Sequence, residues 1–103
     1  MTKLDAFTIG TFAPLVGTRF TILDAATGDA VPLTELELIE ANSLGEAGHR
    51  QREPFSLLFA SREPQALRDD TYRLEHERLG SFELFVVPVE QDAHGVRYEA
   101  IFS

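Results

Sequence analysis

The chain has 103 residues, the usual length of one domain and too short for two, and 44% of its residues are hydrophobic. It contains no cysteine, which excludes disulfides, thiolate nucleophiles and cysteine-ligated metal centres. The formal net charge of -8 disfavours binding to the phosphate backbone of nucleic acids or to anionic lipid headgroups, so we expect neither kind of partner.

The N-terminal segment 1–7 contains Lys3 and Asp5 and leads into no long apolar run. The longest apolar run, 84–89, is far shorter than the ~20 residues of a membrane-spanning helix. We therefore expect neither a cleaved leader nor a membrane span, and we predict a cytoplasmic location.

The first predicted element is a short helix or helical turn within residues 8–17, ended by Gly17. Pro14 is tolerated only in a first helical turn, which favours Thr11 over Thr8 as the N-cap. The side chains expected to face inward are those of Phe12, Leu15 and Val16. A helix this short is not stable alone, so we expect it to plug the core.

Alternating apolar and polar residues then predict strands over 19–23, 31–41, 55–60, 71–76, 81–89 and 97–102. A bulge is expected near Thr34, because Val31 and Leu33 are out of phase with Leu36 and Leu38. The inward positions predicted for the last four strands include Phe55, Leu57, Phe59, Tyr72, Leu74, Leu84, Val86, Tyr98, Ala100 and Phe102. The strand over 81–89 is apolar on both faces, which predicts that it is central in the sheet or covered on both sides.

The connections carry turn residues. We expect a hairpin turn at 24–29, a long loop over 42–53, and a second loop over 61–70 with a helical turn near 65–68. Strands at this spacing predict a mainly β fold, a small antiparallel, about six-stranded and partly closed barrel with one short N-terminal helix. A β-sandwich is the alternative, and residues 1–103 are expected to form one barrel-like domain.

Tyr72, Glu75 and His76 are the most suggestive group for chemistry, because a tyrosine and a histidine on one strand face can line a pocket. In the alternative interpretation, Tyr72 packs in the core and His76 bonds the backbone of a turn. The three histidines match no metal-ligand spacing, and no nucleophile elbow or phosphate-binding glycine motif occurs. We therefore expect no catalytic residues, no metal and no cofactor, and a non-enzymatic role is favoured.

Basic side chains cluster in the two long loops on either side of the strand over 55–60. They are His49, Arg50 and Arg52 in the first loop and Arg62 and Arg68 in the second. Loops often carry binding residues, so these residues form a candidate site for a small anion or a partner. The alternative is that they only keep the loops soluble.

Four motifs carry a resemblance to a known family. They are PFSLLF at 54–59, YRLEH at 72–76, ELFVVPV at 83–89 and YEAIF at 98–102. Together they resemble a family of small bacterial proteins described as a domain of unknown function. The resemblance covers nearly the whole chain and supplies no catalytic residues. It implies an association with phage-tail-collar-like proteins.

Two functions remain open from the sequence. The first is a non-catalytic interaction or accessory module of a larger bacterial or phage-tail-like assembly, with a protein partner bound at an exposed strand edge or apolar patch. The second is a small-ligand-binding barrel or weak enzyme that uses Tyr72 and His76, which requires a pocket of at least ~300 Å³. A homodimer is compatible with either function.

Overall fold

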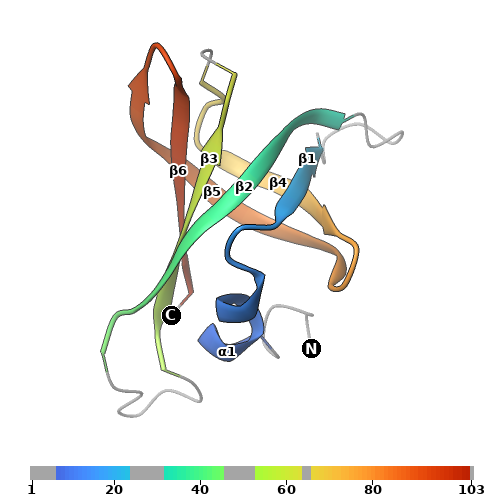
Figure 1. Cartoon of the computed structure of the whole chain (residues 1–103), viewed down its shortest axis with the longest axis vertical. Coiled ribbons are helices and arrows are strands. Elements are labelled where there is room, and N and C mark those ends of the chain that lie inside the picture. The colour runs from blue at the N-terminus through green and yellow to red at the C-terminus, as the bar shows by residue number, and fades with distance from the viewer. Residues whose placement is uncertain (1–6, 24–31, 46–52, 64–65, 103) are drawn as a thin grey trace.

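The computed structural model describes residues 7–23, 32–45, 53–63 and 66–102. Its elements are α1 (Ile9–Phe12), the 3₁₀ turn η2 (Ala13–Leu15), β1 (Arg19–Leu23), β2 (Pro32–Ser43), β3 (Phe55–Ser61), β4 (Asp70–His76), β5 (Gly80–Asp92) and β6 (Gly95–Phe102). The strands form a closed antiparallel barrel in the order β1-β2-β3-β6-β5-β4 (Figure 1). The predicted fold class is therefore confirmed, and pairing of β1 with β4 completes the closure.

The two longest strands, β2 and β5, bend around the barrel. β2 pairs with β1 through residues 32–37 and with β3 through residues 37–43. β5 pairs with β4 through its first half and with β6 through its second. The register slips by one residue at Ile39 and at Val89, near the point where each strand changes partner. Such bulges increase the local twist, which allows one strand to serve two neighbours.

A further slip lies opposite Ile22 and Leu23 of β1, where Leu33 of β2 is skipped. The predicted bulge near Thr34 is therefore confirmed. The predicted hairpin turn at 24–29 and most of the predicted loop over 42–53 lie outside the described residues. The predicted helical turn is wrong for its described part, because residues 66–68 are not helical.

The short helix plugs one end of the barrel, as predicted (Figure 1). The ring of Phe12 is fully buried. Its centroid lies 5.2–6.4 Å from those of five other phenylalanines, Phe7, Phe20, Phe55, Phe82 and Phe102. These rings come from β1, β3, β5, β6 and the segment before the helix, so a single side chain joins most of the barrel wall.

Two predictions about this segment are wrong. Thr8, not Thr11, is the N-cap, and its backbone N–H donates to Thr11 Oγ1 at 3.0 Å. Pro14 fits because it lies in the 3₁₀ turn that follows α1. Val16 is 43% exposed because the chain has already left the helical conformation there, and the stop at Gly17 has the positive φ of 93° that favours glycine.

The two faces of β5 differ in burial. Phe82, Leu84 and Val86 point into the core and are buried. Phe85 and Val89 are each 52% exposed, so of the two predicted alternatives β5 is the central strand, paired with both β4 and β6, and not one covered on both faces. The apolar outer face is therefore a surface feature rather than a second layer of the core.

Replacing Phe12 with alanine should lower the free energy of unfolding by about 3–5 kcal/mol, because a large buried ring is lost and a cavity remains among five others. Urea unfolding followed by circular dichroism measures this change. Val16→Ala is the matched control on the exposed side of the same segment, with an expected change below about 1 kcal/mol. Equal losses in the two variants would contradict the central role of Phe12.

Candidate functional site

His76 ends β4 and is only 6% exposed. Its Nδ1 accepts the backbone N–H of Arg78 at 3.0 Å, so this nitrogen carries no proton. Nε2 then bears the proton and donates to Thr18 Oγ1 at 2.9 Å. The Thr18 hydroxyl in turn donates to the carbonyl oxygen of Leu15 at 2.6 Å. Both ring nitrogens are thus engaged, and the chain of bonds links the β4–β5 turn to the plug.

The ring also packs against Phe20, with 4.4 Å between the two centroids. Burial lowers the pKa of His76 below its ordinary value of 6.5. The charge of Glu77 opposes this shift and the charge of Arg78 adds to it. The interpretation in which His76 bonds the backbone of a turn is confirmed, while a role in ligand binding stays a prediction.

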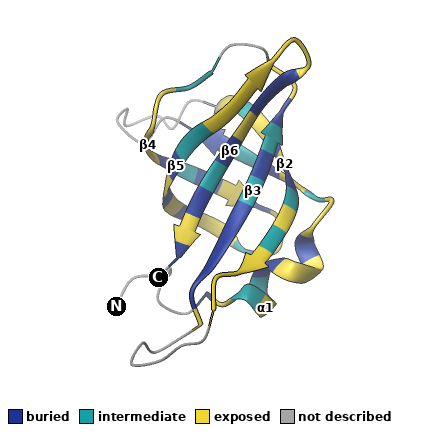
Figure 2. Cartoon of the chain, turned by 90° about the vertical axis from the view of Figure 1, so that its left-hand side faces the viewer, coloured by how far each residue is buried: buried dark blue, intermediate teal, exposed yellow. Residues whose placement is uncertain are grey.

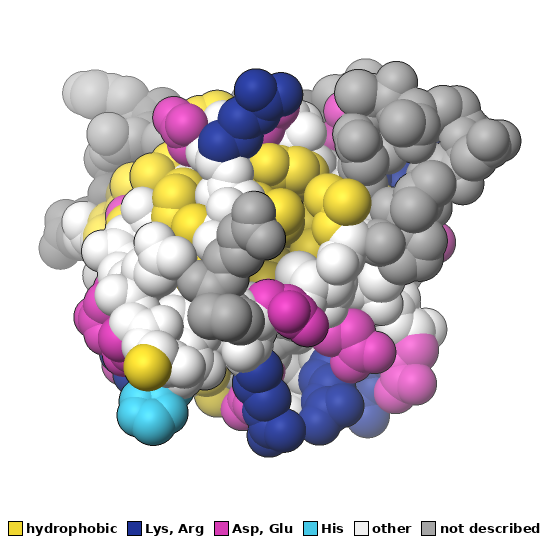
Figure 3. Space-filling view, turned by 90° about the horizontal axis from the view of Figure 1, so that it is seen from above, with side chains coloured by type: hydrophobic (Ala, Val, Ile, Leu, Met, Phe, Trp, Pro, Cys, Tyr) yellow, Lys and Arg dark blue, Asp and Glu magenta, His cyan; other side chains and the backbone are white. Residues whose placement is uncertain are grey.

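Tyr72 and Tyr98 hold the described part of the β3–β4 connection. The Tyr72 hydroxyl donates to the carbonyl oxygen of Arg68 at 2.8 Å, and the Tyr98 hydroxyl accepts the backbone N–H of Leu67 at 2.9 Å. Ala66 and Leu67 consequently pack against the core. Figure 3 looks onto this end of the barrel, opposite the plug, and shows apolar side chains near its centre with charged ones around them.

The predicted basic cluster is only partly described. His49, Arg50 and Arg52 lie outside the described residues. Arg62 and Arg68 stand at opposite ends of the β3–β4 connection, and both are exposed. Arg62 lines a hollow on the outside of the barrel, whereas Arg68 does not.

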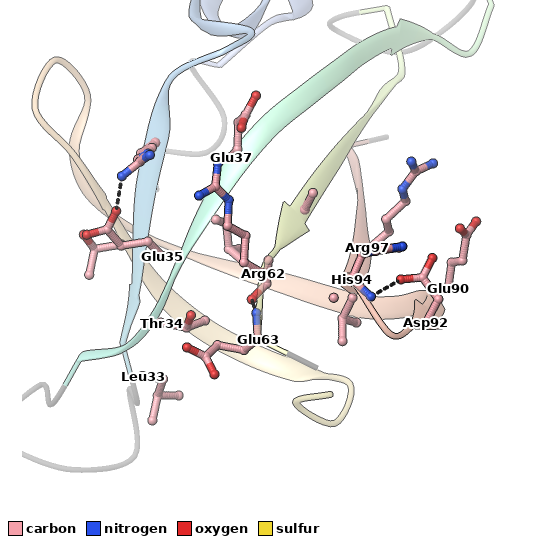
Figure 4. A pocket seen from close by; sticks show the side chains of 17 residues that line it. Leu33, Thr34, Glu35, Glu37, Arg62, Glu63, Glu90, Asp92, His94 and Arg97 are labelled. Atoms are coloured by element: carbon pink, nitrogen blue, oxygen red, sulfur yellow. Dashed lines mark hydrogen bonds and ion pairs between the residues drawn. The ribbon is translucent and has the colours of Figure 1, made fainter. Parts of the chain in front are cut away.

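This hollow has a volume of about 840 Å³ and lies over β1, β2, the end of β3 and the β5–β6 hairpin (Figure 4). Its floor includes Ala60, which the ladder places between Glu37 of β2 and Arg97 of β6. The turn at Gly95 packs tightly against β3, because a Cβ there would lie 1.9 Å from the carbonyl oxygen of Ser61. A side chain at position 95 would therefore push the hairpin away from the hollow.

The hollow carries charges of both signs. Arg19 and Glu35 form an ion pair at 3.5 Å, with both side chains more than 60% exposed, so the pair contributes little stability. Arg62 and Arg97 form no ion pair with any described residue. The sequence placed Arg97 on an outward strand face, but nothing in its local pattern linked it to Arg62.

A second hollow of about 560 Å³ lies beside the first and reaches His76, Thr18 and Glu75. Neither hollow reaches Tyr72. The structure therefore does not bring Tyr72, His76 and Arg62 together around one cavity. Tyr72 and His76 both lie on β4, but only His76 lines the second hollow, and Arg62 lines the first.

The outer surface of β3, β6 and β5 carries an apolar patch, which we call the outer apolar face. It consists of Leu58, Phe85, Val87, Val89 and Ile101. Ile101 is 61% exposed, whereas Leu58 and Val87 are half-buried. Figure 2 shows this side of the barrel, with an exposed segment near the end of β6. The sequence pattern placed Phe85, Val87 and Val89 together on one face of β5 and left open whether that face is covered.

The fold and these surfaces define a small antiparallel barrel whose mouth is closed by an N-terminal plug. The chain belongs to the family described as Domain of unknown function (DUF6916), whose model matches residues 7–102, and the predicted resemblance to such a family is confirmed. No curated protein and no solved structure matches the chain. In the described part of the chain, no helix is long and apolar enough to cross a membrane.

The hydrogen bonds of His76 predict a pH-dependent stability. Because its pKa is lowered in the folded state, the unfolded chain binds the extra proton more readily. The contribution of neutral His76 to the free energy of unfolding is fully present above pH 6.5. It decreases as the pH falls through the lowered pKa that His76 has in the folded state. Urea unfolding at several pH values should show this decrease in the native chain and a flatter profile in His76→Asn. Parallel profiles would contradict it.

Proposed function

We propose that this chain is a non-catalytic interaction module that binds a protein partner within a larger assembly. The observation that carries the proposal is the outer apolar face. Phe85, Val89 and Ile101 are each at least half exposed there, on strands rather than in loops. Large apolar side chains gathered on the surface of a small domain favour a protein contact.

The hydrogen bonds of His76 and Tyr72, the side chains best suited to catalysis, support the same proposal. The His76 nitrogens and the Tyr72 hydroxyl are occupied by backbone and threonine partners that hold the barrel together. The interior is filled by aromatic and aliphatic side chains, as is usual for a small barrel. The surfaces remaining for recognition lie on the outside.

The assembly we propose is a phage-tail-like one, in which the chain is an accessory component. A barrel suits such a role, because most of its backbone is paired between neighbouring strands and its recognition surface is made by side chains on the outside of the wall. Association with a phage-tail-collar-like protein is the specific form of the proposal.

The double variant Phe85→Ser and Ile101→Thr should lose a co-expressed partner, because the two most exposed contacts beside Val87 are removed. Co-expression with products of neighbouring genes, followed by affinity capture and quantitative mass spectrometry, measures this loss. Unfolding of the double variant should match that of the native chain to within about 1 kcal/mol.

Leu44→Thr is the matched control, since Leu44 is 51% exposed, lies just beyond the end of β2 and is not part of the outer apolar face. It should retain the partner at the native level. Retention of the same partner by the double variant would overturn the proposed docking face.

A second candidate function is weak binding of a small anion in the hollow over Ala60. The observation that favours it is the pair Arg62 and Arg97, which line the hollow and form no ion pair with described residues. Guanidinium groups bind carboxylates and phosphates through paired hydrogen bonds. The carboxylates around the hollow oppose this binding and keep it weak.

Titration with inorganic phosphate, followed by amide NMR shifts, tests the second candidate. Shifts are expected at Ala60, Arg62 and Arg97 and should disappear in Arg62→Gln/Arg97→Gln. Arg73→Gln is the control, because Arg73 lies on β4 outside the hollow. Shifts that persist in the double variant would remove this candidate.

A further inference from the structure

We infer that the partner of the outer apolar face is a basic amphipathic protein segment, one that presents apolar side chains flanked by lysine or arginine. This inference rests on the proposed function and names the chemistry of the partner. The observation behind it is the charge of the residues that surround the apolar side chains.

Glutamates lie within and around the face. The ladder places Glu99 of β6 between Leu58 of β3 and Val87 of β5, in the same cross-strand row. Glu40 of β2 lies on the other side of Leu58. Carboxylates therefore stand beside the half-buried centre of the face on neighbouring strands.

Two further glutamates of β5, which lie toward its two ends, extend the set of carboxylates around the outer apolar face. Glu83 lies two residues before Phe85 and is exposed, and Glu90 follows Val89 and is also exposed. The basic side chains paired with them in the ladder are Arg73, opposite Glu83, and Arg97, opposite Glu90. Neither pair comes within ion-pair distance in the described structure.

The apolar side chains are therefore surrounded by four glutamates and only two arginines, which leaves an excess of negative charge. In a chain of net charge -8, this excess of negative charge attracts a basic segment over long range. The apolar contacts supply affinity, while the glutamates accelerate association and select against acidic partners. A second copy is the less favourable occupant, because two like-charged borders would meet across a two-fold axis.

The position of the most exposed side chains suits an apolar anchor. The β5–β6 ladder covers residues 87–92 and 95–99, and Phe85 and Ile101 lie just beyond it on the two strands. A partner segment that crosses the two strands at this point would place apolar side chains on Val87 and on Phe85 or Ile101. Basic side chains of the same segment would then reach Glu83 and Glu99.

The test uses a short amphipathic peptide made of leucine and lysine, with a leucine–glutamate peptide of the same pattern as its counterpart. Binding to the full chain is followed by amide NMR. The basic peptide should shift the amide signals of Phe85, Val87, Glu99 and Ile101. Its affinity should decrease as salt is added, because salt screens the charges. Equal binding of the acidic peptide, or shifts confined to other surfaces, would overturn the inference.

Glu83→Gln/Glu99→Gln should weaken binding of the basic peptide by about tenfold, since each rim charge contributes modestly. Glu35→Gln/Glu63→Gln removes the same number of charges from the hollow and should leave affinity within about twofold. Equal weakening by the two double variants would mean that only the overall charge matters, which overturns the inference. Sedimentation that shows dimerisation through Phe85 and Ile101 would also overturn it.

Failure of the inference can be separated from failure of the proposed function. A co-expressed partner that is retained by Phe85→Ser/Ile101→Thr contradicts the docking face itself. A partner that is lost from that variant but is insensitive to salt and to Glu83→Gln/Glu99→Gln supports the face and contradicts only its basic occupant.

Discussion

The packing of Phe12 is the constraint on which the rest of the barrel depends. The β5–β6 ladder ends at Val87 and Glu99, so the first half of β5 and the end of β6 are not joined by it. At that end Phe82 of β5 and Phe102 of β6 both contact the Phe12 ring instead. One aromatic side chain thus replaces a stretch of backbone pairing, and the plug completes the wall rather than merely covering it.

The hydrogen bonds of His76 fix the same plug from its other side. The Thr18 hydroxyl accepts the imidazole N–H and donates to the carbonyl oxygen of Leu15, the last residue of η2. A neutral histidine is required, because Nδ1 must remain an acceptor for the Arg78 N–H. The hydrogen bonds of His76 thus have a structural role in holding the plug, and the surfaces left for recognition lie on the outside of the barrel.

The period-two pattern predicted the six strands and their inward side chains because one face of each strand must be buried. It could not decide whether the outer face of β5 is covered, because Phe85 and Val89 give the same sequence pattern whether solvent, a partner or a second layer lies against them. It placed His76 inward but not beside Thr18, because strand pairing in three dimensions brings residues of β4 next to the segment before β1. That Arg62 and Arg97 line the same hollow depends on the β3–β6 ladder in the same way.

The inward side chains determine the barrel, whereas the outward ones are free to vary. Membership of the family therefore says little about activity. The interior positions, such as Phe55 and Tyr98, determine the barrel, and any chain that conserves the fold needs side chains of this kind there. The outer apolar face is under no such requirement, because serine or threonine at positions 85 and 101 would satisfy a strand equally well. Burial in the core therefore does not require large apolar side chains at these exposed positions, and the proposed protein contact would give them a role.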